Sequence, residues 1–554
     1  MQISRESELV SRYLPLSLAA ITIFVSTNIG ADPVNLPKLT LLVLSASLFI
    51  GIGFKSIIEL LKYDRKTKLI CLTFLIGLFI SLLFGRSSFI TNFFGAWARN
   101  TGALTYLSLL IVFLLIGASP SRRISANISL AIYIAGLINI VYGLSFIITG
   151  KDLINWSNRY GKFLSTLGNP DFASGFLGLV YAVGLYFVLD QKQKHAIRIA
   201  AGILSPVIIL VILKTGALQG LILVALSSGL YLSIWFLTTC KSKRLKIGYV
   251  FAAIGGMALT ILGMLQIGPL SSILYKPSVS IRGAYWRAAM AMFESSPIYG
   301  IGLDSYGDWY RRSRDAGALL IPGVDVTTDA AHNVFLDLLA GGGLLLTLPY
   351  LALIIYVTQR GIISIKRDPK DLLSQGLFVS WVCYLAQSAI SINQIGLAIW
   401  GWALAGAVVS YSKISNEDLP QKKLMKKIKS KKILKESTFM VSIASITLGA
   451  LLILPVQIAE AKWRNAVKTR NINKILTAAD SWPKSCGRYM MTYNLFAGTS
   501  YTQQALSLIQ KCRNLNKDDF QSLLLIEQFV TNDSDKLKLK REAHRLDPLN
   551  PKYK

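Results

Sequence analysis

Long apolar stretches recur along the first 457 positions of this 554-residue chain, and they limit the folds that it can adopt. Each is about 17 to 25 residues long, the length that an α-helix needs to cross a hydrocarbon layer of roughly 30 Å. Hydrophobic residues make up 53% of the sequence, and the mean hydropathy is +0.48, unlike a soluble chain. Backbone groups in lipid must be hydrogen-bonded internally, and the sequence lacks the alternating pattern of a β-barrel. It therefore predicts an all-α, polytopic integral membrane protein.

Thirteen spans are expected, and their spacing divides the chain into parts. The spans lie at residues 13–30, 39–54, 69–84, 103–118, 127–149, 172–189, 199–213, 216–239, 247–267, 334–357, 376–392, 395–411 and 439–457. The first twelve form a membrane domain at residues 1–412, which contains one large loop at residues 268–333. A basic linker at 413–437 and an additional span at 438–457 follow. Residues 458–554 form a polar tail.

The positions of Lys and Arg between the spans indicate the orientation of the chain. A cytoplasmic N-terminus places most of the basic residues that lie between spans on the inner side. The linker holds nine lysines between Lys413 and Lys435, and we expect it to lie on the anionic lipids of the inner leaflet. The odd number of spans then places the tail outside. The net charge of +30 is thus explained mostly by topology and does not indicate a nucleic-acid partner.

The tail differs from the rest of the chain in being polar with helical patterns. Its last stretch, SDKLKLKREAHRLDPLNPKY at residues 534–553, resembles the end of a tetratricopeptide unit. We expect a short helical-repeat module that recruits a protein partner, and a plain capping bundle is the alternative. Cys486 and Cys512 both lie in this tail. An oxidising outer compartment permits a disulfide between them, and free thiols are the alternative.

Several common classes of site are missing from the sequence. It has no Walker loop, no dinucleotide glycine fingerprint, no CxxC pair and no HExxH motif, which removes the usual nucleotide and zinc sites. Asp171 and Asp337 lie at the outer ends of their spans, and no charged residue lies near the centre of one. Ion- and proton-coupled carriers usually place such residues at mid-membrane. The absence of such residues counts against a transporter. The polar candidates concentrate on the outer side instead, so we expect the site there.

His332 is the candidate for chemistry among the three histidines. His195 lies in a cytoplasmic loop and His544 in the tail, and we interpret both as ordinary surface residues. If Asp329 is the N-cap of the next helix, His332 occupies the third helical position. The positive end of the helix dipole would then keep the imidazole neutral, and a neutral imidazole can act as a general base. An interfacial histidine without a role is the alternative.

A second cluster of unusual residues lies upstream in the large loop. It is IRGAYWRAAMAMFESSPIYGIGLDSYGDWYRRSRD, residues 281–315. Arg282 and Trp286 have the four-residue spacing of one helix face. Pro297 should end that helix, and the glycines of the following YGIG predict a tight turn.

Together these motifs resemble the O-antigen ligase and polymerase superfamily of polytopic membrane glycosyltransferases. Their order is an arginine, then YW, then P-x-x-G-x-G-x-D-x-Y, and then A-H-N-x-x-L after the loop. The resemblance extends over the first twelve spans. It includes FGAWARNTGALTYLSLL at 94–110, LGNPDFASGF at 167–176, TGALQG at 215–220 and SINQIGLAIWGWALAG at 391–406. An extra span followed by a helical-repeat tail occurs in some members.

The resemblance implies transfer of a glycan from undecaprenyl diphosphate to an acceptor hydroxyl, by ligation or polymerisation, in the biosynthesis of lipopolysaccharide or another surface polysaccharide. The reaction would take place on the outer face of the bacterial cytoplasmic membrane. It would invert the anomeric carbon and need no metal or other cofactor. The acceptor would be a glycan, a lipid or a protein. A solute transporter, for example of bicarbonate, and a non-catalytic glycan-assembly scaffold are the alternatives.

The resemblance also implies roles for individual residues. His332 would be the general base, and Arg282 would be the principal ligand of the diphosphate, whose developing negative charge guanidinium groups stabilise. Arg99 would be the second cation. Four further residues are candidates for sugar or phosphate contacts, with a helix cap or a buried contact between spans as the alternative: Asn333, Asn169, Asp171 and Gln219. Ion pairing on the loop surface explains three other candidates equally well, namely Arg287, Asp304 and Arg311.

Two positions depart from the pattern of the family. Gly341 stands near the position where many relatives carry a glutamate, and we expect the three glycines that begin there to serve close helix packing. Leu218 or Gln219 replaces an arginine that binds diphosphate in some members. Either Arg99 compensates, or the donor is bound differently, or this chain does not catalyse.

Overall fold

The computed structural model describes residues 5–27, 30, 32–154, 156, 158, 160–275, 277–414 and 434–553. This part of the chain is helical, with no strand in it. Each of the thirteen expected spans overlaps a helix, and ten helices of the described part are long and apolar enough to cross a membrane. The expected all-α, polytopic fold is thereby confirmed. Most of the expected linker at 413–437 lies outside the described residues.

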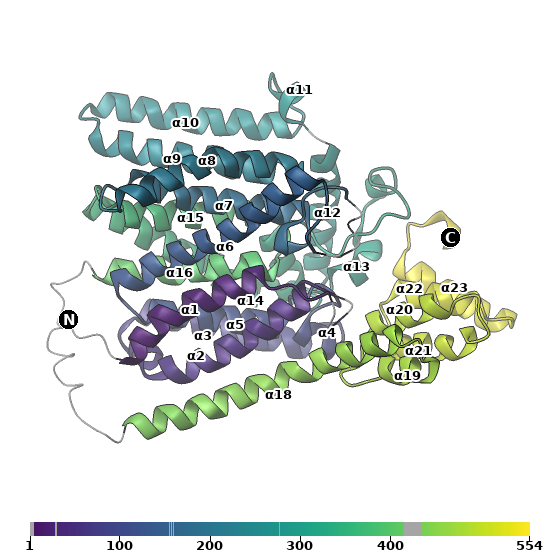
Figure 1. Ribbon diagram of the computed structural model, residues 1–554. Helices are drawn as coiled ribbons and strands as arrows, with labels where there is room; N and C mark the ends of the chain where they lie inside the picture. Colours follow the sequence, from purple (N-terminus) through teal and green to yellow (C-terminus); the bar gives the residue numbers. More distant parts are fainter. Residues whose placement is uncertain are drawn as a thin grey trace.

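The apolar helices form a bundle in which neighbours lie side by side along their length (Figure 1). The helices that overlap the expected spans are α1 (Arg5–Ile23), α2 (Asn35–Tyr63), α3 (Arg65–Phe84), α5 (Ala103–Gly117), α6 (Arg122–Thr149), α7 (Pro170–Leu189), α8 (His195–Thr215), α9 (Gln219–Thr239), α10 (Lys243–Met264), α14 (Val334–Arg367), α15 (Leu372–Ser388), α16 (Ile395–Ile414) and α18 (Leu434–Lys468). At one end of the bundle lie the short helices α4 (Phe89–Phe94), α11 (Ser271–Leu274), α12 (Pro277–Ser295) and α13 (Tyr306–Ser313).

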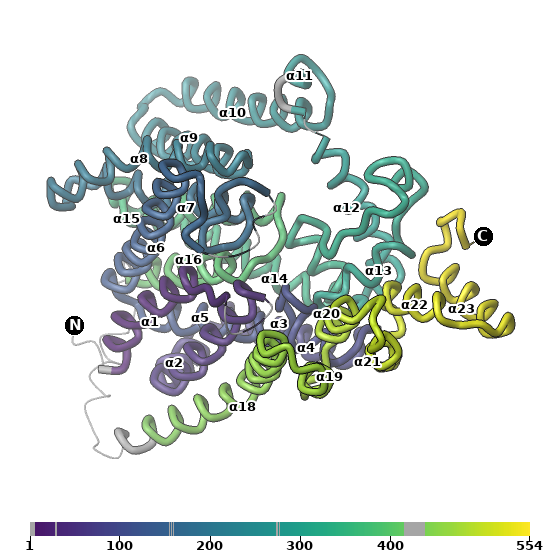
Figure 2. Tube along the Cα trace, turned by 45° about the vertical axis from the view of Figure 1, so that its right-hand side comes forward, coloured from purple at the N-terminus to yellow at the C-terminus, as the bar shows by residue number. Residues whose placement is uncertain are grey.

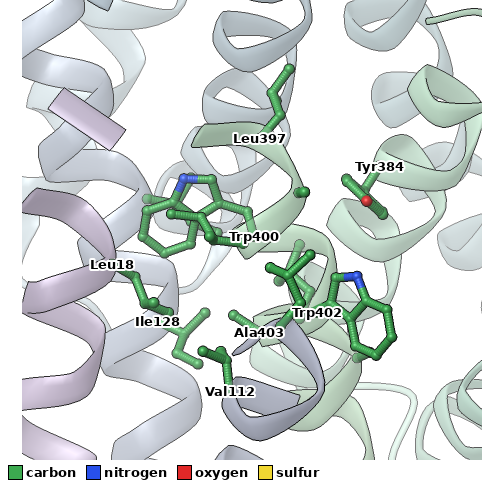
Figure 3. Close-up of a cluster of buried hydrophobic side chains, with 14 of the residues drawn as sticks. Leu18, Val112, Ile128, Tyr384, Leu397, Trp400, Trp402 and Ala403 are labelled. Carbon is green, nitrogen blue, oxygen red and sulfur yellow. The ribbon is translucent and has the colours of Figure 1, made fainter. Parts of the chain in front are cut away.

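The helix α16 forms the centre of the bundle. It is apolar on all sides and packs against α1, α5, α6, α14 and α15. Trp400 is fully buried, and its indole N–H donates a hydrogen bond to the Thr22 hydroxyl of α1 at 2.9 Å. Figure 3 shows Trp400 beside Leu18 and Ile128 in this core. At the edge of the bundle, α10 is exposed along almost its whole length, as a helix in contact with lipid would be.

Small residues allow α18 to lie close along α2. A Cβ atom added at Gly51 would lie 2.4 Å from the Cα atom of Ser442, and one added at Gly449 would lie 2.1 Å from the Ser47 hydroxyl oxygen. Such residues are typical of helix pairs that pack in lipid. The helix continues beyond this contact to Lys468, so the last span and the start of the tail form one rod.

The helix α14 is broken near its start, where Gly343 has a φ of +61°. A turn at residues 297–302 fills the break, and Gly300 and Gly302 in this turn also have positive φ values, as expected from the sequence. Four backbone hydrogen bonds join the turn to the helix: Ile301 N–H to Ala340 (2.9 Å), Gly302 N–H to Gly341 (3.0 Å), Leu344 N–H to Pro297 (2.8 Å) and Leu345 N–H to Ile298 (3.1 Å). The turn therefore forms hydrogen bonds with the backbone N–H and carbonyl groups that the break leaves without a partner inside the helix.

Close contact explains why the break consists of glycines. A Cβ atom at Gly300 would lie 2.2 Å from the carbonyl oxygen of Gly341, and one at Gly343 would lie 2.5 Å from the backbone of Ile298. The Ser81 hydroxyl of α3 donates to the carbonyl of Gly342 at 3.0 Å. The expected role of the three glycines in close packing agrees with these contacts.

The tail forms a separate small helical layer at the end of the bundle that carries α4, α12 and α13 (Figures 1 and 2). Its helices are α19 (Ile472–Ala479), α20 (Cys486–Phe496), α21 (Thr502–Leu515), α22 (Phe520–Glu527) and α23 (Asp533–Leu546). Trp463 of α18 is buried in the core of this layer. A disulfide between Cys486 and Cys512 joins α20 to α21.

Candidate functional site

His332 lies at the end of the large loop, two residues before α14. The helix begins at Val334, and Asn333 is its N-cap, since the Asn333 amide oxygen accepts two backbone N–H groups of the first turn at 3.0 and 3.1 Å. The prediction that Asp329 is the N-cap is therefore wrong. Asp329 lies four residues before the helical cap and pairs with Arg99 instead. His332 has a φ of +54° and precedes the helix.

The ring of His332 stacks on Tyr285 of α12, with 5.6 Å between the centroids and 26° between the planes. The Tyr285 carbonyl accepts a hydrogen bond from the Tyr306 hydroxyl at 2.6 Å, which fixes this part of α12 against α13. Burial and the positive charge of Arg282 lower the pKa of His332, while Asp329 acts in the opposite direction. The lowered pKa favours the neutral imidazole at neutral pH, and burial is its largest cause.

The structure brings most of the predicted site residues together around this imidazole. The charges of Arg282, Arg99 and Asp171 all lie near enough to act on His332. Arg282 precedes Tyr285 by one turn of α12, and Asp171 lies in the first turn of α7. Three segments that are far apart in the sequence therefore meet at one end of the bundle.

Arg99 is held by two carboxylates. Its Nε lies 3.0 Å from Asp304 Oδ1, and its Nη1 lies 3.2 Å from Asp329 Oδ1. Asp304 also accepts the backbone N–H groups of Ala96 and Thr101 at 2.8 and 3.0 Å. Burial alone would lower the pKa of Arg99, but the neighbouring carboxylates raise it. Asp304 is 2% exposed, so its interpretation as a surface partner is wrong: it anchors the segment that carries Arg99 to the large loop.

Two of the predicted contact residues are helix caps. Asn333 caps α14, and the Asn169 amide oxygen caps α7 by accepting the Asp171 N–H at 2.8 Å. Both caps aim the first turn of a helix, with its positive end, at the region around His332. Their side chains thus have a structural role at the edge of the site.

Gln219 lies deeper in the bundle, at the first position of α9. It is 4% exposed, and neither its amide oxygen nor its amide nitrogen has a hydrogen-bond partner among the described residues. It faces Gly175, one turn along α7 from Asp171, where an added Cβ would lie 3.7 Å from the Gln219 oxygen. A buried amide without a partner is costly, and it could bind a polar group of a ligand.

A cleft of about 490 Å³ lies between the large loop and the tail, and His332 lines it. Its other lining residues are Tyr285, Gly307, Asp308, Arg311, Thr327, Thr328, Asp329, Asp519, Phe520 and Gln521. Three of them are carboxylates, and one is an arginine that is already paired with Asp547 at 3.0 Å. Burial and the negative charge of Asp519 raise the pKa of Asp308 to about 7. The cleft is therefore lined by carboxyl groups, and that of Asp308 is partly protonated at neutral pH.

Arg311 and Arg287 have different surroundings. Arg311 is 8% exposed, and its guanidinium lies over the ring of Phe520 at 4.7 Å as well as against Asp547. The surface-pairing interpretation of Arg311 is therefore wrong, because the tail covers it. Arg287 pairs with Asp315, and both side chains are exposed, which agrees with that interpretation.

The sequence did not point to every residue of this region. Tyr285 lies in the YW motif, and its spacing of three residues from Arg282 places it on the same face of α12. That spacing could have identified it as the neighbour of His332. Asp308 and Asp519 gave no such signal, because the cleft depends on how the tail packs against the loop.

Comparison with known proteins agrees with this architecture. Residues 173–351 match a family model described as O-antigen ligase, and no curated protein matches the chain. The matched segment runs from α7 into α14 and contains both Arg282 and His332. This match supports a membrane glycosyltransferase-like role in polysaccharide assembly. Residues 173–351 are thus similar to the O-antigen ligase family, and the bundle of apolar helices fits a multi-pass membrane protein of that superfamily.

Proposed function

We propose that this protein transfers a glycan from undecaprenyl diphosphate to an acceptor hydroxyl on the outer face of the bacterial cytoplasmic membrane. The observation that carries the proposal is the position of His332. Its imidazole lines an open cleft and stacks on Tyr285, one turn of α12 from Arg282. A base with a cation nearby is the arrangement that this displacement needs.

His332 acts as the general base. It takes the proton of the acceptor hydroxyl while that oxygen forms a bond to the anomeric carbon of the donor. The bond between that carbon and the diphosphate oxygen breaks, and undecaprenyl diphosphate leaves with the electron pair. Attack on the face opposite the leaving group inverts the anomeric carbon. Burial and the charge of Arg282, which lower the pKa of His332, keep the base form present at neutral pH.

Arg282 is the principal ligand of the diphosphate. Its guanidinium can form two parallel hydrogen bonds to phosphate oxygens, so that the charge of the leaving group is stabilised as it develops. Arg99 adds positive charge nearby but is already held by Asp304 and Asp329. Gln219, with its unpartnered amide, binds a sugar or phosphate oxygen of the donor in place of the arginine of some relatives. This mechanism uses no metal ion.

The orientation follows the positive-inside rule. A cytoplasmic N-terminus places the tail outside. The tail and the large loop lie at the same end of the bundle and contact each other, so the loop with His332 and Arg282 lies outside as well (Figure 1). An extracytoplasmic site is where a flipped, lipid-linked donor would be available.

The test is complementation of a deletion strain with wild type, His332→Ala and His195→Ala. His195 is exposed at the start of α8, at a distance from the cleft, and serves as the matched control. We expect His332→Ala to lose the surface polysaccharide on gels and to accumulate lipid-linked glycan by mass spectrometry, and His195→Ala to behave as wild type. The size distribution of the residual glycan distinguishes ligation from polymerisation.

Normal polysaccharide with His332→Ala protein present in the membrane would rule out this mechanism. Loss of polysaccharide on deletion of the tail, together with a silent His332→Ala, would instead support an assembly scaffold. Uptake of bicarbonate that is lost in the same deletion strain would support transport.

A further inference from the structure

The tail supplies one wall of the cleft that contains His332. Asp519, Phe520 and Gln521, at the start of α22, line the cleft together with loop residues. The cleft volume of about 490 Å³ lies within the range of roughly 300 to 1,000 Å³ that is typical of small-ligand sites. A recruiting module would not need to line such a cavity.

This wall is fixed to the large loop by several polar contacts. Arg312 of α13 lies 2.6 Å from Asp518, and the Asn516 amide donates to Asp308 at 2.7 Å. Asp519 caps α22 by accepting the Ser522 N–H at 2.9 Å, so the first turn of this helix is held in place. The tail residues therefore face His332 in a defined geometry.

The charges divide the site into two sides. Arg282, the proposed ligand of the donor diphosphate, is not among the residues that line the cleft. The cleft instead presents Asp308, Asp329 and Asp519, while the charge of Arg311 is taken up by Asp547. The one arginine of the cleft is thus already paired and offers an anionic group no free guanidinium, whereas the carboxyl and amide groups exchange hydrogen bonds with sugar hydroxyls.

On this basis, and resting on the proposed function, we infer that the tail forms the acceptor-binding wall of the transferase site and that the acceptor is a neutral, hydroxyl-rich glycan end. Gln521 and Asp519 contact its hydroxyls from one side, and His332 reaches the reacting hydroxyl from the other. The donor approaches from the side of Arg282. The tail is thus a specificity-determining part of the site.

Gln521→Trp tests the position of this wall. Gln521 is exposed, so a larger side chain can be placed there without disturbing the tail core, and it would fill the cleft. Gln503→Trp is the matched control, because Gln503 is also exposed, on α21, and does not line the cleft. The readout is the initial rate at which pulse-labelled glycan moves from the lipid carrier to polymer in the deletion strain.

We expect Gln521→Trp to lower this rate by about tenfold or more and Gln503→Trp to leave it unchanged. Hydrogen–deuterium exchange of α20 and α21 that matches wild type shows that the tail of each variant is folded. Equal rates for wild type and folded Gln521→Trp would overturn the inference. If His332→Ala abolishes transfer in the same strain, the proposed function stands independently of that result.

Two substitutions of opposite charge test whether the acceptor is neutral. Gln521→Glu is nearly isosteric, and Gln521→Lys adds a positive charge at the same position. A neutral acceptor predicts that the two variants change the rate in the same direction and by less than about threefold relative to each other. A faster Gln521→Lys and a slower Gln521→Glu, differing by about tenfold or more, would show an anionic acceptor and overturn this part of the inference.

Discussion

Arg314 and Asp547 form an ion pair in which both side chains are fully buried. Nη2 of Arg314 lies 2.8 Å from Oδ1 and 2.9 Å from Oδ2 of Asp547. Arg314 belongs to the large loop, whereas Asp547 begins the DPLNP sequence at the end of the tail. Arg311 reaches the same carboxylate at 3.0 Å. This cluster joins the two parts of the chain that line the cleft.

Asp547→Asn should loosen the tail. The substitution keeps the shape of the side chain but leaves two buried guanidinium groups without their counter-charge, which costs about 3–5 kcal/mol. Hydrogen–deuterium exchange of α22 and α23 measures the effect and should show a loss of protection. Asp315→Asn is the control, because its pair with Arg287 is exposed and is worth at most about 1 kcal/mol. Unchanged protection in Asp547→Asn would mean that other contacts hold the tail.

The pH dependence of transfer should report on His332. The base form is required, and its pKa is lowered, so activity should persist below the ordinary histidine pKa and fall as the pH drops through the lowered value. Arg282→Gln removes a positive charge and should move this acid limb to higher pH. Asp329→Asn removes a negative charge and should move it to lower pH. Each shift should be about one pH unit or less.

The control for these shifts is Arg287→Gln, since Arg287 is exposed and pairs with Asp315. Its acid limb should coincide with that of wild type. Limbs that move in the same direction for Arg282→Gln and Asp329→Asn would show that the limb does not belong to His332.

Gly343→Ala should destabilise the membrane domain. Gly343 has a φ of +61°, and a Cβ there would lie 2.5 Å from the backbone of Ile298, so strain and overlap together cost about 2 kcal/mol or more. Gly255→Ala on α10 is the opposite case, because a Cβ meets nothing within 4 Å and alanine favours the helix. The midpoint of thermal unfolding in detergent should fall for the first variant and stay or rise for the second. An unchanged midpoint for Gly343→Ala would contradict the broken geometry of α14.

Replacement of Cys486 and Cys512 by serine should destabilise the tail. The disulfide joins positions 26 residues apart, and a loop of this size contributes about 3 kcal/mol.

Alkylation of the denatured wild-type protein without reductant should label the free Cys71, Cys240 and Cys383 and spare the bonded pair. Labelling of all five cysteines after rapid lysis would show that the pair is reduced.

The sequence predicted the membrane architecture well because apolar length is a local property. Every expected span overlaps a helix, and the YGIG turn has the positive φ values that its glycines suggested. Local sequence patterns gave wrong predictions at positions where contacts between distant parts of the chain determine the structure. The expected cap at Asp329 is an example, because Asn333 caps the helix and the Asp329 carboxylate pairs with Arg99.

The candidate site was predictable only in part. The motifs indicated Arg282 and His332, and the structure places them near each other. Burial of Asp304 and Arg311 could not be read from the sequence, because the residues that cover them come from distant parts of the chain. The acidic wall contributed by Asp519 arises from the packing of the tail, for which the sequence carries no spacing rule.

The break in α14 has a consequence for biogenesis. The outer part of this helix cannot close its own hydrogen bonds at Ala340 to Leu345, so on entering lipid alone it would expose polar backbone groups. The turn at residues 297–302 that satisfies them is synthesised before α14. We therefore expect the turn to lie at the membrane surface before α14 inserts and to hydrogen-bond the break as the helix enters. Insertion of α14 and assembly of the surface that carries His332 would then be completed in a single step.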